Sequence, residues 1–480
     1  MKNTLDKSDL EHLKSLVQGN CWIEDPEVLQ SYLTEWRGLF TGQTQLMLMP
    51  ENTAEVSSIL AYCFEHEIAV VPQGGNTGLV GGGIPGLNSN RPEILLSSRR
   101  LNKIHNIDAD NFTLTVGAGC ILADVQKAAA EVQCVFPLSL AAEGTCHIGG
   151  NLATNAGGIN VLRYGNTRDL MLGLEVVLPD GRVYKNLSGL RKDNTGYSLD
   201  HLFIGSEGTL GFITAATVKL FPEPLGVATA WIAIDSPKDA LKLLGSARKR
   251  LGDELVAFEL IPKIAIDLVL KHISSHRDPL DTEYPWYVLL EMANSCEALQ
   301  TEASLTAFLT EFLDGGLIKD AVLATNISQR NAFWSIRHDI SLAQKSAGAS
   351  IKHDISLPIS KLPEFVKRAD LLVEQEIPGS RPVAFGHLGD GNLHYNVSQP
   401  KDIPADVFLD HWSNLNRLIH SLAAELGGSF SAEHGIGVLK LDELERFTDA
   451  TKLSVMQDIK MLLDPKNIMN PGKILHVKSD

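Results

Sequence analysis

A chain of 480 residues is too long for a single hydrophobic core, so its length predicts two or three domains. The formal net charge of −16 at pH 7 argues against nucleic acid as a partner, because no basic excess is present to neutralise phosphates. Six scattered cysteines without a C-x-x-C pair are typical of a reduced intracellular protein. With no signal-peptide pattern and no membrane-spanning apolar run in the sequence, we expect a soluble, cytoplasmic protein.

The first part of the chain leads into a glycine-rich loop. Residues 1–40 have the pattern of short helices, and an apolar strand at residues 68–72 runs directly into residues 73–85. Six of the ten residues 74–83 are glycine, and consecutive backbone N–H groups in such a loop can form a nest for an anion such as a pyrophosphate. The glycine spacing matches neither a Walker A loop nor a Rossmann fingerprint. The pattern favours a phosphate-binding loop over an unstructured surface loop.

Two further segments are rich in small residues. Residues 142–158 combine glycines with amide and hydroxyl side chains that could orient a ligand, and residues 200–213 form a third such loop. Each segment alone could be a packed turn. Their presence in one domain indicates a long ligand that is held at both ends.

The segment 221–224, Phe-Pro-Glu-Pro, interrupts the pattern of strands and predicts a domain boundary. After it, strands alternate with amphipathic helices in the way expected of a ferredoxin-like α+β layer. We therefore divide the chain into four parts: an N-terminal helical segment (1–40), a ligand-binding domain (41–224), a substrate or cap domain (225–430) and a C-terminal helical segment (431–480).

The most informative stretch for chemistry is a predicted hairpin at residues 385–397. If Asp390-Gly391 is a two-residue turn, His387 faces His394 across the pair, and the two imidazoles could share one metal ion. Glu433 and His434 follow about 40 residues later. Two histidines and one carboxylate form the ligand set of catalytic zinc or iron sites. The alternative is a hairpin with two surface histidines and an unrelated Glu-His pair.

Other charged residues gather on predicted faces of the same region. Arg337 and Ser341 lie one turn apart on the helix predicted near residues 328–345, so they share a face. Lys352 and Asp354 point to the same side of the strand predicted at residues 351–357. Such side chains are more often solvated than functional.

Six segments together resemble the FAD-dependent oxidoreductases of the vanillyl-alcohol oxidase and p-cresol methylhydroxylase type, from about residue 40 to the C-terminus. The segments that carry the resemblance are residues 72–78, 146–158, 191–197, 205–211, 387–394 and 432–437. The resemblance implies an α+β fold, with a two-subdomain FAD-binding domain of the vanillyl-alcohol oxidase type and a ferredoxin-like α+β substrate (cap) domain.

The resemblance also implies where FAD binds. The first glycine-rich loop would hold the pyrophosphate, and the second would lie along the flavin. Relatives with covalent FAD carry a histidine in the first loop, where this chain has Gln73 and Asn76, so we expect non-covalent FAD. The implied cofactor contacts are Pro72, Gln73, Gly74, Gly75, Asn76, Thr77, Gly78, Leu79, Glu143, Gly144, Thr145, Gly149, Gly150, Asn151, Thr154, Asn155, Gly157, Gly158, Glu207, Gly208, Ile213 and Asn470.

The activity implied is the oxidation of D-2-hydroxyglutarate to 2-oxoglutarate, with zinc bound by His387, His394 and Glu433. His434 would be the base that takes the hydroxyl proton. The substrate contacts implied are Arg337, Ser341, Lys352, Asn396 and His434.

Several alternatives stay open at this point. The substrate could be D-lactate, D-malate or glycolate, and the metal could be manganese, cobalt or iron. A zinc hydrolase would use the same ligand set to activate water. For the electron acceptor the resemblance implies an electron-transfer flavoprotein or a quinone, and a homodimer is left open.

Overall fold

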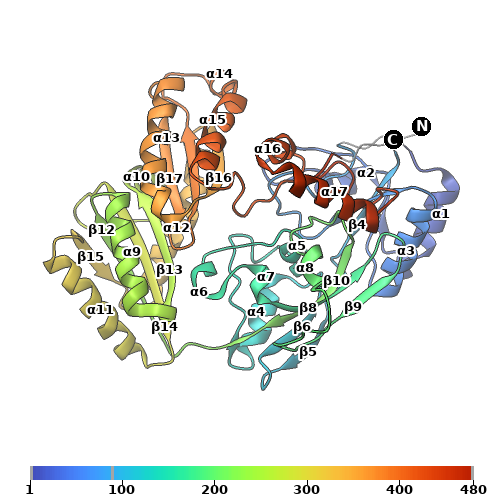
Figure 1. Cartoon of the computed structure of the whole chain (residues 1–480), viewed down its shortest axis with the longest axis horizontal. Coiled ribbons are helices and arrows are strands. Elements are labelled where there is room, and N and C mark those ends of the chain that lie inside the picture. Colours follow the sequence, from blue (N-terminus) through green and yellow to red (C-terminus); the bar gives the residue numbers. More distant parts are fainter. Residues whose placement is uncertain (1–3, 88–90, 477–480) are drawn as a thin grey trace. The chain divides into compact units, whose positions relative to one another are not determined.

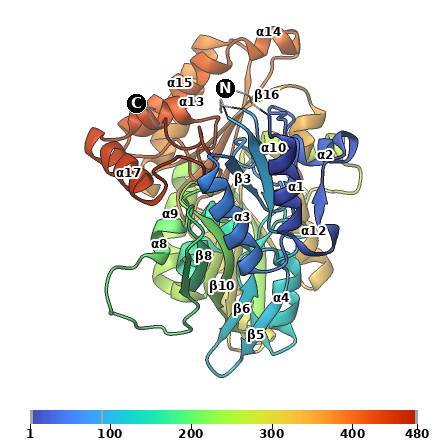
Figure 2. The ribbon, with the colours of Figure 1, turned by 90° about the vertical axis from the view of Figure 1, so that its right-hand side faces the viewer.

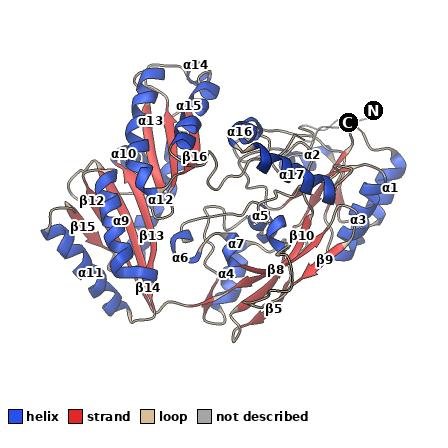
Figure 3. Cartoon of the chain, viewed as in Figure 1, coloured by secondary structure: helices blue, strands red, loops and turns tan. Residues whose placement is uncertain are grey.

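The computed structural model describes residues 4–87 and 91–476. Contacts within the chain divide it into two units, coloured along the sequence in Figure 1. Unit 1 comprises Met1–Gly158, Gly165–Glu223 and Glu433–Asp480, and unit 2 comprises Ile159–Tyr164 and Pro224–Ala432. Both units combine helices with sheets, as the predicted α+β class requires (Figure 3).

Unit 1 begins with a small sheet that ends in the first glycine-rich loop. Its strand order is β1-β2-β4-β3, with β3 and β4 parallel. Helices α1 and α3 lie side by side against it (Figure 2), and the Tyr62 hydroxyl donates to Asp9 at 2.8 Å between them. The elements are α1 (Lys7–Ser15), β1 (Trp22–Ile23), α2 (Pro26–Leu33), β2 (Met47–Leu48), α3 (Thr53–Glu65), β3 (Ala69–Gln73) and β4 (Glu93–Ser97).

A second, antiparallel sheet completes unit 1, so the two-subdomain arrangement predicted for an FAD-binding domain is present. Its strand order is β5-β6-β10-β8-β9. The strands are β5 (Ile104–Asp108), β6 (Thr113–Gly117), β8 (Met171–Val177), β9 (Val183–Asn186) and β10 (Phe212–Lys219), with a separate pair of β7 (Cys134–Val135) and β11 (Phe221–Pro222). The helices are α4 (Leu122–Ala130), α5 (Ile148–Ala153), α7 (Thr167–Leu170), α8 (Asp200–Phe203), α16 (Leu441–Phe447) and α17 (Ala450–Leu463).

Unit 2 is built on one seven-stranded antiparallel sheet of order β15-β12-β14-β13-β17-β18-β16. Its first four strands have the relative order 4-1-3-2 of a ferredoxin-like layer, which confirms the fold expected for this domain. The strands are β12 (Gly226–Ile234), β13 (Leu255–Pro262), β14 (Trp286–Asn294), β15 (Asp320–Leu323), β16 (Ser350–Ser356), β17 (Arg381–His387) and β18 (Asn392–Ser398).

Helices cover both faces of this sheet (Figure 1), and apolar side chains fill the space between helices and sheet. One face packs against α9 (Pro237–Leu251), α11 (Ala298–Asp314), α13 (Leu362–Glu376), α14 (Ala405–Leu409) and α15 (Trp412–Glu425). The other face packs against α10 (Lys263–His272) and α12 (Ile327–Ser346), and α6 (Val161–Tyr164) also belongs to unit 2. Buried apolar area is the main stabilising term in such a layered unit.

Within residues 4–87 and 91–476, no helix has both the length and the apolar character needed to cross a membrane.

Candidate active site

In unit 1 the first two glycine-rich loops pack backbone against backbone. A Cβ atom added at Gly75 would lie 2.1 Å from the carbonyl oxygen of Thr145, so no larger residue fits there. One at Gly74 would lie 3.4 Å from the Cβ of His147 and 3.7 Å from the Cα of Gly150. The structure thus brings together predicted cofactor residues from both loops.

Other glycines in these loops are not required by packing within the protein. A Cβ atom added at Gly78, Gly144 or Gly150 would meet no atom within 4 Å. Open space beside a bare backbone allows a ligand to approach the N–H groups closely. Buried Oδ1 atoms of Asn151 and Asn470 also lack a hydrogen-bond partner among the described residues, as expected of acceptors that await a ligand. These residues fit FAD.

Two predicted cofactor side chains brace the loop instead of facing open space. Gln73 Nε2 donates to the carbonyl oxygens of Tyr32 and Gly83, both at 2.9 Å. Asn76 Nδ2 donates to the carbonyl oxygen of Thr34 at 3.0 Å. Their amide N–H groups therefore hold the loop in shape, and any contact they make with FAD must use other atoms.

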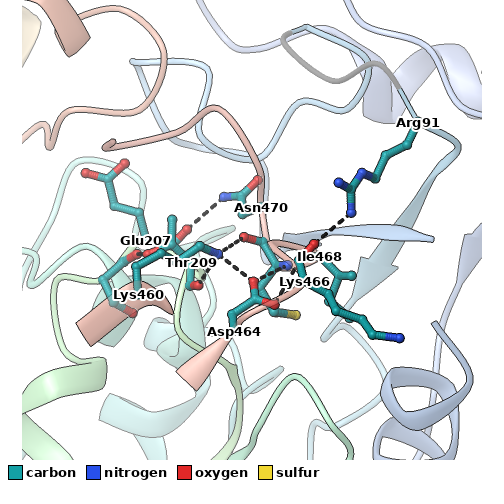
Figure 4. Close-up of polar contacts among 10 residues, drawn as sticks. Arg91, Glu207, Thr209, Lys460, Asp464, Lys466, Ile468 and Asn470 are labelled. Carbon is teal, nitrogen blue, oxygen red and sulfur yellow. Dashed lines mark hydrogen bonds and ion pairs between the residues drawn. The ribbon is translucent and has the colours of Figure 1, made fainter. Parts of the chain in front are cut away.

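The C-terminal segment is fixed to the same region by a buried lysine that the sequence did not single out (Figure 4). Lys460 Nζ donates to Asp464 Oδ2 at 2.5 Å and to the carbonyl oxygens of Met469 at 2.8 Å and Thr209 at 2.9 Å. Burial lowers the pKa of this lysine, and the adjacent Asp464 opposes that effect. All three ammonium donors are satisfied, which is the condition for burying such a charge.

Asn470 links this segment to two loops that carry predicted cofactor residues. Its Nδ2 donates to the carbonyl oxygens of Glu207 at 2.8 Å and Gly82 at 2.9 Å. Asn470 itself has a φ of 45°, in the left-handed region that Asn tolerates better than most residues.

The Glu207 carboxylate positions the loop that contains Glu433 and His434. It accepts the N–H groups of Ile436 at 2.7 Å and Gly437 at 2.8 Å. Burial raises the pKa of Glu207, and these two hydrogen bonds act in the opposite direction. Just before them, His434 Nε2 lies 3.8 Å from Glu433 Oε1.

In unit 2 the predicted two-residue turn at Asp390-Gly391 is wrong. The register of β17 and β18 pairs Phe385, not His387, with His394, and the N–H groups of Asp390 and Gly391 both donate to the carbonyl of His387. The connection is therefore a four-residue loop and the register is shifted by two residues. A shift of two keeps side chains on the same face, so His387 and His394 remain diagonal neighbours with ring centroids 5.7 Å apart.

Polar side chains form a row across four strands on the α10/α12 face of the sheet. Going from β13 to β16, Glu259 is opposite His387, His394 is opposite Asp354, and Asn396 is opposite Lys352. Four predicted metal and substrate residues thus lie in one row: His387, His394, Lys352 and Asn396. The same row contains Glu259 and Asp354, which were not predicted as part of the site.

Asp354 is buried and makes several polar contacts. One oxygen, Oδ1, lies 4.0 Å from His394 Nδ1 and accepts from Asn392 Nδ2 at 3.0 Å. The other accepts the N–H of Ala432 at 3.2 Å.

Glu259 joins Arg337 to His387. Its Oε1 lies 2.6 Å from His387 Nδ1, and its Oε2 accepts from Arg337 Nε at 2.7 Å. Burial alone would raise the pKa of Glu259, but His387 and Arg337 together hold it at about 2. The carboxylate is therefore ionised, and the sequence offered no motif that marks it.

The substrate residues differ in their surroundings. Arg337 is buried, and its Nη2 has no hydrogen-bond partner among the described residues. Asn396 is also buried and donates to Gln344 Oε1 at 2.8 Å, whereas Ser341 is exposed on α12. Arg337 is thus the member of this group with a spare buried donor suited to a carboxylate.

These donor sets fit a divalent metal. His387 uses Nδ1 for Glu259, which leaves Nε2 as a ligand atom. Ligand atoms of Asp354 and His394 lie within 4.8 Å of each other, and so do those of Glu433 and His434. Imidazole with carboxylate suits zinc, iron or manganese, so zinc is not confirmed by this geometry.

The fold is of the FAD-binding type found in vanillyl-alcohol oxidase and its structural relatives. The structure resembles p-cresol methylhydroxylase with substrate bound, with a TM-score of 0.76, 15% identity and 99% of each chain covered. It also resembles 4-ethylphenol oxidase from Gulosibacter chungangensis, with a TM-score of 0.73, 18% identity and 98% of each chain covered. At these identities the resemblance concerns the fold alone.

The sequence matches are more specific. Residues 44–186 match the FAD binding domain model, and residues 224–474 match the C-terminal domain of FAD linked oxidases. The chain therefore belongs to the family of FAD-linked oxidases, and its use of FAD is confirmed.

Curated relatives extend over nearly the whole chain. The mitochondrial D-2-hydroxyglutarate dehydrogenase of Arabidopsis thaliana is 40% identical over 479 residues, which cover 98% of this chain and 82% of that protein. The rat enzyme of the same name is 38% identical and covers 99% and 86%. A D-2-hydroxyglutarate–pyruvate transhydrogenase of Saccharomyces cerevisiae is 34% identical and covers 98% and 95%.

The comparisons correct one prediction. The cytoplasmic location inferred from the sequence is wrong, because relatives from rice, Arabidopsis, rat and cattle at about 40% identity are named mitochondrial, which points to mitochondria. Scattered free cysteines reflect a reducing compartment and do not distinguish the cytoplasm from other reducing spaces.

Proposed function

We propose that this protein is an FAD-dependent dehydrogenase that oxidises D-2-hydroxyglutarate to 2-oxoglutarate. The observation that carries the proposal is the identity of about 40%, over 98% of the chain, to proteins named D-2-hydroxyglutarate dehydrogenase. The buried Arg337 supports a carboxylate-bearing substrate, since its Nη2 donor lacks a partner within the described structure. A zinc hydrolase would not need the FAD-binding fold, so we set that alternative aside.

We assign the residues of the site as follows. His387, His394 and Glu433 would hold a divalent metal, for which zinc is our first choice, and Arg337, Ser341, Lys352 and Asn396 would bind the substrate. Such an ion, when bound, supplies a positive charge that lowers the pKa of a coordinated hydroxyl group.

His434, whose Nε2 lies 3.8 Å from Glu433 Oε1, would take the hydroxyl proton on an imidazole nitrogen. FAD, when bound by the glycine-rich loops of unit 1, supplies the acceptor for the hydride that leaves Cα. The open backbone at Gly78, Gly144 and Gly150 fits non-covalent binding, with the 22 contacts predicted above.

Electrons must leave the protein after each turnover. We propose an electron-transfer flavoprotein or a quinone as the acceptor. The yeast relative named a transhydrogenase supports a second candidate, in which pyruvate accepts the electrons.

A substrate screen tests the proposal. Purified protein reconstituted with FAD is assayed with a dye acceptor against D-2-hydroxyglutarate, D-lactate, D-malate and glycolate, and then with pyruvate in place of the dye. We expect the highest kcat/KM for D-2-hydroxyglutarate, and a preference for D-lactate would overturn the substrate assignment. Treatment with a chelator should abolish turnover without releasing FAD, and added zinc should restore it; full activity of a metal-free preparation would overturn the metal assignment.

A further inference from the structure

One buried carboxylate, Glu259, contacts both a predicted metal ligand and a predicted substrate ligand. It lies on β13, is 1% exposed, and faces His387 directly across the β13–β17 pair. Each of its oxygens has a different partner: Oε1 pairs with His387 Nδ1 at 2.6 Å and Oε2 with Arg337 Nε at 2.7 Å.

The contact to His387 decides which ring nitrogen can bind a metal. The distance of 2.6 Å between Glu259 Oε1 and His387 Nδ1 is that of a hydrogen bond, which we assign as Nδ1–H donating to the carboxylate oxygen. Nε2 is then the unprotonated nitrogen, the one that can coordinate a metal, and the ring cannot rotate without breaking a buried hydrogen bond. Carboxylates in this position orient metal-binding histidines and raise their basicity.

The contact to Arg337 fixes the guanidinium in the same way. Its Nε is held by Glu259 and its Cζ lies 4.9 Å from the centre of the Phe385 ring. The Nη2 donor remains buried and unpaired among the described residues. Because the Glu259 carboxylate balances the buried charge of the guanidinium, the Nη2 donor of Arg337 can remain in place while no substrate is bound.

We propose that Glu259 is a positioning residue that holds His387 for the metal and Arg337 for the substrate carboxylate, and thereby couples the two binding events. The proposal rests on the proposed function, since that function assigns His387 to the metal and Arg337 to the substrate. Loss of Glu259 should weaken both metal binding and substrate binding, although Glu259 contacts neither ligand itself.

The chain provides a matched control in Glu291, on the neighbouring strand β14. Glu291 is buried to 4% exposure and also pairs with an arginine of α12, since Arg330 donates to it from Nε at 2.8 Å and Nη2 at 2.7 Å. Trp334 Nε1 donates at 2.8 Å and Thr229 Oγ1 at 2.7 Å, so none of its partners is a histidine. Arg330 and Arg337 are two helical turns apart. Glu291→Gln therefore measures the cost of disturbing a buried Arg–Glu pair of this unit without touching His387.

The experiment compares full-length, FAD-loaded wild type, Glu259→Gln, Glu259→Asp and Glu291→Gln. Zinc affinity is measured by competition with a chelator and metal analysis, together with FAD content, Tm and the kcat and KM for D-2-hydroxyglutarate. We expect Glu259→Gln to weaken zinc binding by about 10- to 100-fold and to raise KM, with partial recovery in Glu259→Asp. Glu291→Gln should leave zinc affinity at the wild-type value.

The proposal is overturned if Glu259→Gln binds zinc as wild type does, or if Glu291→Gln shows the same loss. Turnover of the wild type is a separate readout: a protein that binds zinc through this site but oxidises no 2-hydroxy acid would refute the proposed function and leave the positioning role intact. If Glu259→Gln does not fold, the tautomer of His387 decides instead. The tautomer is measured by NMR of the metal-free wild type with ¹⁵N-labelled histidine, and the His387 signal is identified as the one lost in His387→Gln. We expect a ring protonated on Nδ1, and a ring protonated on Nε2 would overturn the proposal.

Discussion

Replacement of Glu207 should loosen the loop that carries Glu433 and His434. The Glu207 carboxylate accepts the partly buried N–H groups of Ile436 and Gly437 at 2.7 and 2.8 Å, so Glu207→Ala leaves both donors without this partner. An unpaired buried donor costs about 1–3 kcal/mol, which gives about 2–6 kcal/mol for two. Burial raises the pKa of Glu207, which means that burying the carboxylate is itself costly and that its removal recovers part of this sum. We therefore expect a net cost near the lower end, about 2–3 kcal/mol.

Amide hydrogen exchange measures this cost where it arises. A loss of about 2–3 kcal/mol in the free energy of local opening should accelerate exchange at Ile436 and Gly437 by about 30- to 150-fold. Glu175→Gln is the control, because Glu175 is a buried glutamate of unit 1 that pairs with Thr53, Thr214 and Lys185 instead of this loop. Unchanged exchange at residues 433–440 in Glu207→Ala, or equal acceleration in the control, would refute the assignment.

Three further predictions concern the chemistry and the pH dependence. His434→Ala should slow flavin reduction by about 10²- to 10⁴-fold, the usual contribution of a general base, and a wild-type rate in stopped flow would exclude that role. Lys352→Ala should lower kcat/KM for D-2-hydroxyglutarate by about 10- to 150-fold through loss of a charge-assisted contact, with little effect on D-lactate; equal loss on both would make Lys352 structural. Burial, assisted by Arg99, lowers the pKa of His147 from 6.5 to about 4. The unfolded chain therefore binds this proton more readily than the folded one, and the free energy of unfolding should fall by about 3 kcal/mol as the pH drops from 6.5 to 4. His147→Gln should flatten this part of the pH profile in denaturant unfolding, and an unchanged slope would count against the burial of His147 as its cause.

The sequence predicted the parts of the fold and site that have a short-range pattern. Dense glycines after an apolar strand located the first loop, and alternation of strands and helices predicted the ferredoxin-like layer that β12 to β15 form. Spacing also placed Arg337 on a helix and Lys352 on a strand, where the structure has them.

The residues that escaped prediction act through contacts distant in the sequence. Glu259 meets His387 across 128 positions, and Lys460 meets Thr209 across 251. Both are charged residues in an otherwise ordinary strand and helix, and only the fold reveals that they are buried. Glu207 was expected as a cofactor contact, but its hydrogen bond to Ile436, across 229 positions, was not predicted. The sequence alone indicates residues of the types that bind metals or substrates, but not the buried charged residues that hold them in position.

The hairpin shows why a local rule can fail while the conclusion drawn from it survives. Asp390-Gly391 is compatible with both a two-residue turn and a four-residue loop, and local preference does not choose between them. Contacts with Leu357, the residue that follows β16, favour the four-residue loop. The Leu357 N–H donates to the Gly391 carbonyl at 3.0 Å, and a Cβ atom at Gly391 would lie 2.3 Å from the Leu357 carbonyl oxygen. The longer loop moves the register by two residues, and because strand side chains alternate with period two, His387 and His394 stay on one face. A shift of one residue would have turned one histidine into the apolar core of the α13/α15 face, and the metal hypothesis would have failed with it.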